Sequence, residues 1–285
     1  MAKPQIAIVG PGNLGTALAV SLRNAGYSIE TVIAHSRGES LRKAQRLARR
    51  VDGHARVDMA GAKAQLIWLC VPDAEIARAA QALAEIAPWK GRVVLHSSGA
   101  LTSDELRPLQ RRGAAVGSLH PLMTFVRGSL PSFAGLPFAI EGDTAAVRIA
   151  RQIVRDLGGQ ANSIRRKDKA AYHAWGTFAS PLLTALLATM ERIAEIAGVN
   201  RTVARRRMMP ILRQTLANYN ALGAPDSFSG PIIRGDIETI RRHLRVLKSV
   251  PAAREVYSSL ARAALQYLPA KNKTALKRVL NSHSR

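Results

Sequence analysis

Short apolar runs alternate with helix-like segments over the first 161 residues of the chain. Runs rich in β-branched residues and bounded by glycine or proline predict buried strands, and apolar residues three and four positions apart predict the helices between them. Eight strands are expected in this way, at 6–9, 28–34, 54–57, 65–71, 92–95, 114–119, 137–140 and 160–164. Strands that alternate with helices are typical of an α/β fold with a mostly parallel sheet.

The pattern changes near residue 162, because only helical periodicity follows. Long apolar-periodic segments cover 168–196, 202–222, 236–248 and 251–267, and Asp236 is placed to cap the third. We therefore expect a Rossmann-like α/β domain over 1–161 and an all-helical domain over 162–285. The turn-rich stretch at 225–236 is longer than most helix connections, which suggests either a functional loop or a helix connection capped by Asp236.

The segment 170–190 has no Lys, Arg, Asp or Glu and is long enough to span a membrane. Its many Ala, Thr, Ser and Gly residues, together with His173 and Pro181, favour a buried core helix and no membrane span. The segment also presents more uncharged surface than a small helical domain buries alone, which predicts a homodimer built on this domain.

The first strand runs into Gly10-x-Gly12-x-x-Gly15 and then into a helix-like segment. Gly10 permits a tight turn, Gly12 allows the backbone to approach a pyrophosphate, and Gly15 allows close packing of helix on strand. The helix N-terminus also offers free N–H groups to an anion. The motif therefore predicts a dinucleotide site, and the expected contacts are Gly10, Gly12, Asn13, Leu14 and Gly15.

The second strand ends at Ser36 and Arg37, where NAD-specific folds usually place an acid for the ribose hydroxyls. A cation and a hydroxyl there suit a 2′-phosphate, which predicts NADP(H) as the cofactor, the alternative being an exposed turn that contains an arginine. Val71, Pro72 and Asp73 follow a later buried strand. We expect them to line the dinucleotide, with Asp73 capping the next helix.

Two further strands end in polar groups at the same expected edge of the sheet. One precedes Ser97 and Ser98, and the other delivers His120 and Pro121. An isolated histidine is more often structural, but an imidazole beside a nicotinamide suits proton transfer near neutral pH. We expect His120 to be the acid/base and Ser97 to hydrogen-bond the reacting group.

The net charge of +23 is uneven, since residues 162–285 hold 22 basic and 7 acidic side chains. Such an excess favours an anionic partner, either a small substrate or a polyanion. The basic residues are spread over several helices without aromatic residues between them, which argues against nucleic acid. One cysteine, no zinc-like spacing and no signal-peptide pattern predict no disulfide, no metal site and a cytoplasmic protein.

Several motifs together resemble Rossmann-type NADP-dependent oxidoreductases whose C-terminal helical part is a domain of unknown function. They are 10–15 (GPGNLG), 71–73 (VPD), 96–101 (HSSGAL), 118–123 (SLHPLM), 172–173 (YH) with 179–180 (AS), and 229–236 (SGPIIRGD). More distantly, the layout is similar to prephenate dehydrogenases and pyrroline-5-carboxylate reductases, which pair a Rossmann domain with a helical dimerisation domain. This resemblance implies a C-terminal domain of the 6-phosphogluconate dehydrogenase C-terminal type.

The resemblance implies an oxidoreductase that moves a hydride between NADP(H) and a C–O or C–N centre of a small anionic substrate. In prephenate dehydrogenases a serine after one strand and a His-Pro-Met after the next contact substrate and nicotinamide, and Ser97 or Ser98 and His120 correspond in order. The implied catalytic residues are His120, Ser97 and His173, with Ser97 also near the cofactor, and the implied substrate contacts are Ser98, His120, His173 and Arg234. A non-catalytic NADP-binding sensor and, less favoured, a polyanion-binding protein are the alternatives.

Overall fold

The computed structural model describes residues 3–59, 63–86 and 88–281 of the chain. The chain divides into two compact units, Met1–Ser180 and Pro181–Arg285. This division falls later than the change of pattern at residue 162, because the helix that begins at Lys169 packs with the sheet of the first unit. The domain boundary at 161/162 stays a prediction.

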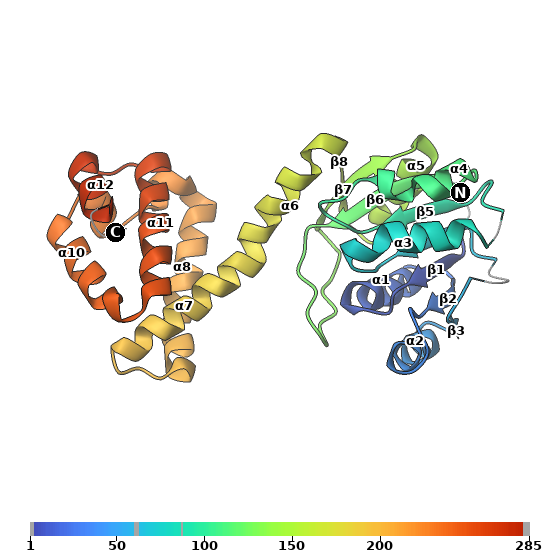
Figure 1. Ribbon diagram of the computed structural model, residues 1–285, viewed down its shortest axis with the longest axis horizontal. Coiled ribbons are helices and arrows are strands. Elements are labelled where there is room, and N and C mark those ends of the chain that lie inside the picture. Colours follow the sequence, from blue (N-terminus) through green and yellow to red (C-terminus); the bar gives the residue numbers. More distant parts are fainter. Residues whose placement is uncertain (1–2, 60–62, 87, 282–285) are drawn as a thin grey trace. The chain divides into compact units, whose positions relative to one another are not determined.

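The first unit is built on an eight-stranded sheet with the order β3-β2-β1-β4-β5-β6-β7-β8 (Figure 1). The strands β6 and β7 are antiparallel, and the other neighbouring strands run parallel. All eight predicted strands are present, and the α/β fold is confirmed. The strands are β1 (Ile6–Val9), β2 (Ile29–Ile33), β3 (His54–Arg56), β4 (Leu66–Leu69), β5 (Val93–His96), β6 (Ala115–Pro121), β7 (Pro137–Gly142) and β8 (Gln160–Ser163).

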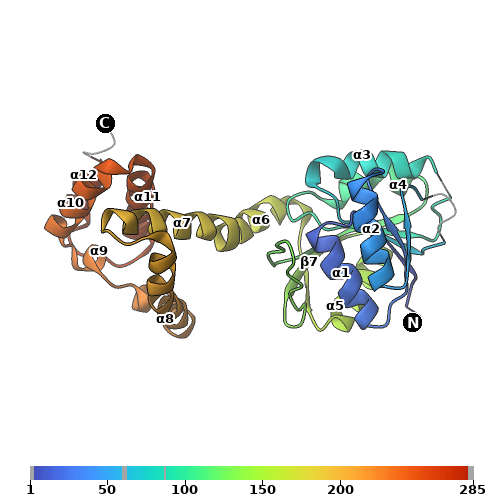
Figure 2. The same cartoon turned by 90° about the horizontal axis from the view of Figure 1, so that it is seen from below.

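Helices cover both faces of this sheet (Figure 2). One face carries α1 (Asn13–Asn24), α2 (Glu39–Arg50) and α5 (Thr144–Asp156), and the other carries α3 (Asp73–Ala84) and α4 (Arg107–Arg111). Side chains alternate along a strand, so Ile6 and Ile8 of β1 join one core while Ala7 joins the other. Burial on both faces explains why the central strands read as continuous apolar runs.

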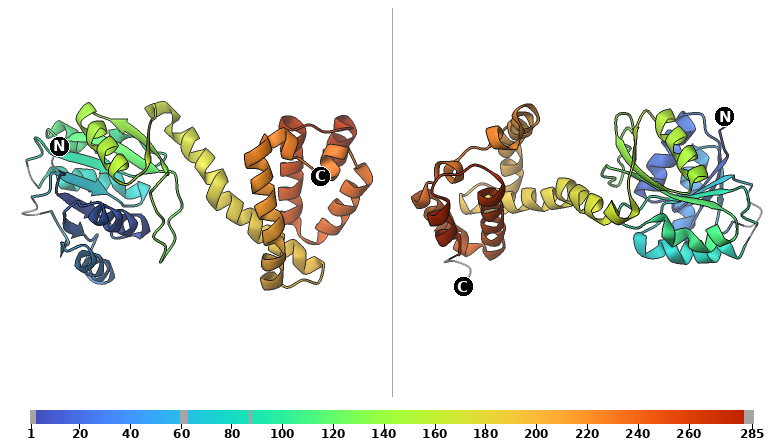
Figure 3. Two further views of the ribbon diagram at one scale, coloured as in Figure 1. Left: turned by 180° about the vertical axis from the view of Figure 1, so that it is seen from behind. Right: turned by 90° about the horizontal axis from the view of Figure 1, so that it is seen from above.

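The second unit is helical, with its core between α10, α11 and α12 (Figure 3, orange to red). Asp236 caps α10 as predicted, since its carboxylate accepts a hydrogen bond from the Thr239 backbone N–H at 3.1 Å. The stretch predicted as a loop instead contains the end of α8 and the short α9, and α12 was not predicted. The helices are α7 (Leu183–Ile196), α8 (Arg201–Ser227), α9 (Pro231–Arg234), α10 (Ile237–Val246), α11 (Pro251–Tyr267) and α12 (Lys273–Asn281).

The uncharged segment 170–190 lies in α6 (Lys169–Thr177), a π-helical turn (Phe178–Leu182) and α7. Pro181 lacks an N–H for the regular ladder, which accounts for the wider turn. The prediction of a buried core helix is wrong for a single copy of the chain, because no side chain of α7 is buried and Phe178 is 70% exposed. Within the described part of the chain, no helix is both long and apolar enough to cross a membrane.

Candidate functional site

The carboxyl ends of β1, β2 and β4 meet where the strand order reverses, and open α/β sheets bind ligands at such points. Gly10 has a φ of 101°, and a Cβ on Gly15 would lie 2.1 Å from the Gly10 carbonyl oxygen. These two glycines therefore make the tight turn and the close packing that the motif predicts. A Cβ on Gly12 would meet no atom within 4 Å, and no side chain caps this end of α1. The open, uncapped N-terminus fits the pyrophosphate of a dinucleotide.

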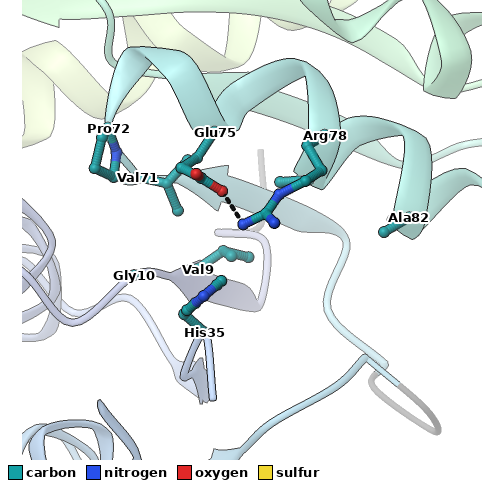
Figure 4. A pocket seen from close by; sticks show the side chains of 9 residues that line it. Val9, Gly10, His35, Val71, Pro72, Glu75, Arg78 and Ala82 are labelled. Carbon is teal, nitrogen blue, oxygen red and sulfur yellow. Dashed lines mark hydrogen bonds and ion pairs between the residues drawn. The ribbon is translucent and has the colours of Figure 1, made fainter.

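A cavity of about 640 Å³ opens beside this turn (Figure 4). Val71 and Pro72 line it, whereas the sequence did not point to His35 or Arg78. Arg78 donates a hydrogen bond to Glu75 on the same helix (dashed in Figure 4). The missed residues of α3 recur at three- and four-residue spacing, which is the pattern of one helix face. The lining is Val9, Gly10, His35, Val71, Pro72, Glu75, Arg78, Ala79 and Ala82.

The remaining residues predicted to bind the cofactor lie around the same strand ends. Ser36 and Arg37 follow β2 and are exposed. Asn13 donates a hydrogen bond from its amide to the carbonyl of Phe125 at 3.1 Å, and the half-buried Leu14 packs against the core. Their contacts with a dinucleotide stay a prediction.

Asp73 does not cap the helix that follows it. α3 begins at Asp73 itself, with Pro72 at the cap position. The carboxylate instead accepts a hydrogen bond from the hydroxyl of Ser98 at 2.8 Å. The capping prediction is therefore wrong, because a serine distant in sequence engages the carboxylate.

His120 lies at the end of β6, with its Nδ1 2.9 Å from the carbonyl oxygen of Ser97. A carbonyl oxygen only accepts hydrogen bonds, so Nδ1 carries the proton and Nε2 of the neutral ring is an acceptor. Burial lowers the pKa of His120, and the charge of Lys169 acts in the same direction. The ring is therefore neutral at pH 7, and Nε2 is able to accept a proton.

His173 reaches the same place from α6. Its ring meets that of His120 edge to face, with the centroids 5.9 Å apart, and Tyr172 lies at 6.3 Å on the same helix. A Cβ on Gly99 would lie 2.5 Å from His173 Cδ2 and 2.8 Å from His120 Nε2. A side chain at position 99 would displace the imidazoles from this arrangement. The structure thus brings two predicted residues together against the loop after β5.

The two serines after β5 are both buried and both engaged within the protein. Ser97 Oγ accepts a hydrogen bond from the indole N–H of Trp68 at 2.8 Å, which leaves its own proton available. Ser98 donates to Asp73 and accepts from the backbone N–H groups of the next loop. Arg234, the last predicted contact, is an exposed residue of α9 in the second unit.

Lys169, at the start of α6, is a buried charge that the sequence analysis missed. The residue is 1% exposed, and its Nζ donates hydrogen bonds to the Ser98 carbonyl at 3.0 Å and to Ser118 Oγ at 2.6 Å. Burial lowers the pKa of Lys169 to about 8, against the opposing charges of Glu141 and Asp73. The sequence does place this lysine at the start of a long uncharged helix. Because it follows other basic residues, however, the pattern predicts an exposed side chain.

A row of buried polar groups crosses the sheet beneath this lysine. His96, Ser118 and Glu141 are paired in register across β5, β6 and β7. Glu141 accepts hydrogen bonds from the backbone N–H and the hydroxyl of Ser103, at 2.7 and 2.8 Å. Both ring nitrogens of His96 bond backbone groups of the next loop, and burial lowers its pKa to about 4. These groups hold the loop after β5 in place.

Two family models match the sequence. Residues 1–121 match a Rossmann-like domain, and residues 136–264 match the domain of unknown function DUF2520. The two matched regions follow one another along the chain. The DUF2520 match begins inside the sheet and includes β7, β8 and α6, so it supplies Lys169 and His173, while the Rossmann-like domain supplies His120. Both domains therefore contribute to the polar strand ends.

Solved structures share the fold of this chain at low sequence identity. BF3122 from Bacteroides fragilis, described as a "putative NADP oxidoreductase", has a TM-score of 0.77 at 23% identity and covers 92% of this chain and 97% of its own. Protein TM1727 from Thermotoga maritima has a TM-score of 0.69 at 22% identity, and the match covers 98% of this chain and 100% of TM1727. A reductive aminase from Aspergillus terreus, in complex with NADPH and ethyl-5-oxohexanoate, has a TM-score of 0.68 at 16% identity. The match covers 97% of this chain and 99% of the aminase. No curated protein matches the sequence.

Proposed function

We propose that this protein is an NADP(H)-dependent oxidoreductase that transfers a hydride to or from a C–N or C–O centre of a small anionic substrate. The observation that carries the proposal is His120, which lies at the same sheet edge as the open glycine turn. Its Nδ1–H is donated to the Ser97 carbonyl, and its Nε2 has no hydrogen bond to any residue that the structure describes. The names of the similar structures support this class, and the reductive aminase together with a pyrroline-5-carboxylate reductase from Coxiella burnetii favours C–N chemistry.

The cofactor site is assigned to the open end of the sheet. Backbone N–H groups at Gly12, Asn13 and Leu14 would bind the pyrophosphate, and Ser36 with Arg37 would bind the 2′-phosphate. The apolar cavity lined by Val71 and Pro72 is large enough for the adenosine, with the ring of His35 and the guanidinium of Arg78 available to stack on the base. NADP(H), when bound, supplies or accepts the hydride.

His120 moves the proton that accompanies the hydride. When the substrate is oxidised, Nε2 accepts the proton of the O–H or N–H group while the hydride leaves the adjacent carbon, and in reduction the same nitrogen returns it. Ser97 donates its hydroxyl proton in a hydrogen bond to the reacting heteroatom. Burial keeps the ring neutral, with the charge of Lys169 acting in the same direction. His173, whose ring lies against that of His120, is proposed to hold the substrate anion.

The protein is also proposed to be a homodimer. No side chain of α7 is buried, and large apolar side chains of α8 are exposed, among them Ile211 at 65% and Leu216 at 62%. A second copy would cover such a surface, which monomeric proteins rarely leave open. Light scattering at micromolar concentration should give twice the mass of one chain, and a monomer would contradict the proposal.

The decisive experiment is titration of the protein with NADPH, followed by measurement of NADPH oxidation with small anionic imines and ketones. We expect tight binding and turnover with at least one compound class. Binding without turnover for any class would favour the sensor alternative. Absence of dinucleotide binding would contradict the proposed function, and nucleic-acid binding that weakens steeply with salt would then favour a polyanion-binding protein.

A further inference from the structure

A second cavity, of about 220 Å³, lies between α1 and α2 next to the glycine turn. Its position is separate from the apolar cavity beside α3. The α2 residues that line it are spaced three and four apart, so they share one face of that helix. The lining is Pro11, Thr16, Lys43, Arg46, Leu47 and Arg50.

The groove is strongly basic and only partly neutralised. Lys43 pairs with Glu39 at 2.8 Å. Arg46 and Arg50 have no ion pair and no hydrogen bond to any other residue that the structure describes. Three like charges at this spacing repel one another. A bound anion would offset that repulsion.

The chemistry of the lining selects the kind of anion. Thr16 offers a hydroxyl, and the three cations offer ammonium and guanidinium donors. A phosphate monoester carries close to two negative charges and three oxygens that accept hydrogen bonds from several directions. The volume equals that of roughly seven waters at about 30 Å³ each, which leaves room for one phosphate group.

We propose that the groove between α1 and α2 binds a phosphate monoester, at a site separate from the pyrophosphate site of the glycine turn. Two sources share this chemistry. Pro11 lies between Gly10 and Gly12, so the 2′-phosphate of NADP(H) bound at the turn is one source, with the cations of the groove acting in addition to Ser36 and Arg37. This case rests on the proposed function. The phosphate of a separate molecule is the other.

The test compares two double variants of α2 with equal charge changes. K43Q/R46Q removes two cations of the groove, and R42Q/R49Q removes two exposed cations of the same helix that do not line it. Calorimetry measures the affinity of each full-length protein for 2′,5′-ADP, for 5′-AMP and for inorganic phosphate, the last with and without NADP. The first two ligands differ only in the 2′-phosphate.

At least tenfold weaker binding by K43Q/R46Q, and not by R42Q/R49Q, supports the proposal. If the loss affects 2′,5′-ADP but not 5′-AMP, the cofactor is the source. If it affects inorganic phosphate equally with and without NADP, the source is a separate molecule. Equal losses in both variants, no change beyond twofold, or no binding of any probe by the wild type would overturn it. Retained phosphate binding without any adenine nucleotide binding would instead reject the proposed function alone.

Discussion

The two halves of one sheet edge are built in different ways. At the ends of β1, β2 and β4 the backbone is open, with glycines and a largely apolar wall, and none of the described residues there is a fully buried charge. At the ends of β5 and β6 side chains fill the space, including a buried lysine and a histidine whose Nδ1 is bonded to a backbone carbonyl. An open backbone end suits binding of a large ligand, and a filled polar end suits control of a proton. This contrast predicts that mutations at the first end change cofactor affinity and that mutations at the second change turnover.

The largest expected effect is the loss of turnover in His120→Ala. Removing the acid/base should lower kcat by roughly 10²–10⁴-fold with NADPH affinity nearly unchanged. The control is His35→Ala, at the other end, which should weaken NADPH binding and leave kcat nearly intact. Measured kcat, NADPH affinity and Tm separate the roles. A His120→Ala enzyme of full speed and reduced stability would mean that the imidazole only caps the strand end.

Gly12→Val should weaken dinucleotide binding without unfolding the protein. The new side chain enters open space at a φ of −77°, which any residue adopts, and blocks the approach of a pyrophosphate. Loss of charge-assisted hydrogen bonds predicts affinity lower on the order of 100-fold for both NADPH and NADH. Gly15→Ala is the contrast, because its Cβ would meet the Gly10 carbonyl and lower the Tm. Unchanged NADPH affinity in Gly12→Val would show that the glycine turn is not part of the NADPH site.

Arg37→Asp should change the choice of cofactor. Replacing the cation by an anion is expected to weaken NADPH binding by about tenfold or more, while NADH binding changes little. Arg49→Asp, an exposed change on α2, is the control for net charge. Calorimetric affinities for both cofactors provide the measurement. Equal affinity of the wild type for NADPH and NADH would contradict the preference itself.

The last expected effect concerns stability and leaves activity aside: a pH-dependent difference in the unfolding free energy caused by Lys169. Its folded-state pKa of about 8 lies below the unfolded value, so between the two the unfolded chain binds a proton that the folded chain has released. The contribution of Lys169 to the free energy of unfolding is therefore lowest below pH 8. Between the folded and unfolded pKa values it rises by roughly 1.4 kcal/mol per pH unit.

Denaturation in urea checks this sign. Between pH 8 and about pH 9.5 the unfolding free energy of the wild type should rise by roughly 2 kcal/mol relative to Lys169→Met. Lys167→Met, at an exposed position, should follow the wild type. Parallel curves for wild type and Lys169→Met would mean that the lysine has an ordinary pKa.

The sequence by itself determined the sheet, the glycine turn and the edge on which the polar groups gather. Alternation and period are local properties, and a tight turn leaves its mark in consecutive residues such as Gly10 and Gly12. His120 could be placed at this edge in the same way, because the carboxyl ends of parallel strands lie at one edge of the sheet.

Only the tertiary structure decided how the filled end is packed and which charge is buried in it. Lys169 and His173 come from a helix that reads as part of another domain, and their burial depends on strands that lie far away in sequence. The hydrogen bond from Ser98 to Asp73, which overturned a predicted helix cap, has the same origin. Burial and pKa are set by neighbours in space, and a local pattern carries no record of those neighbours.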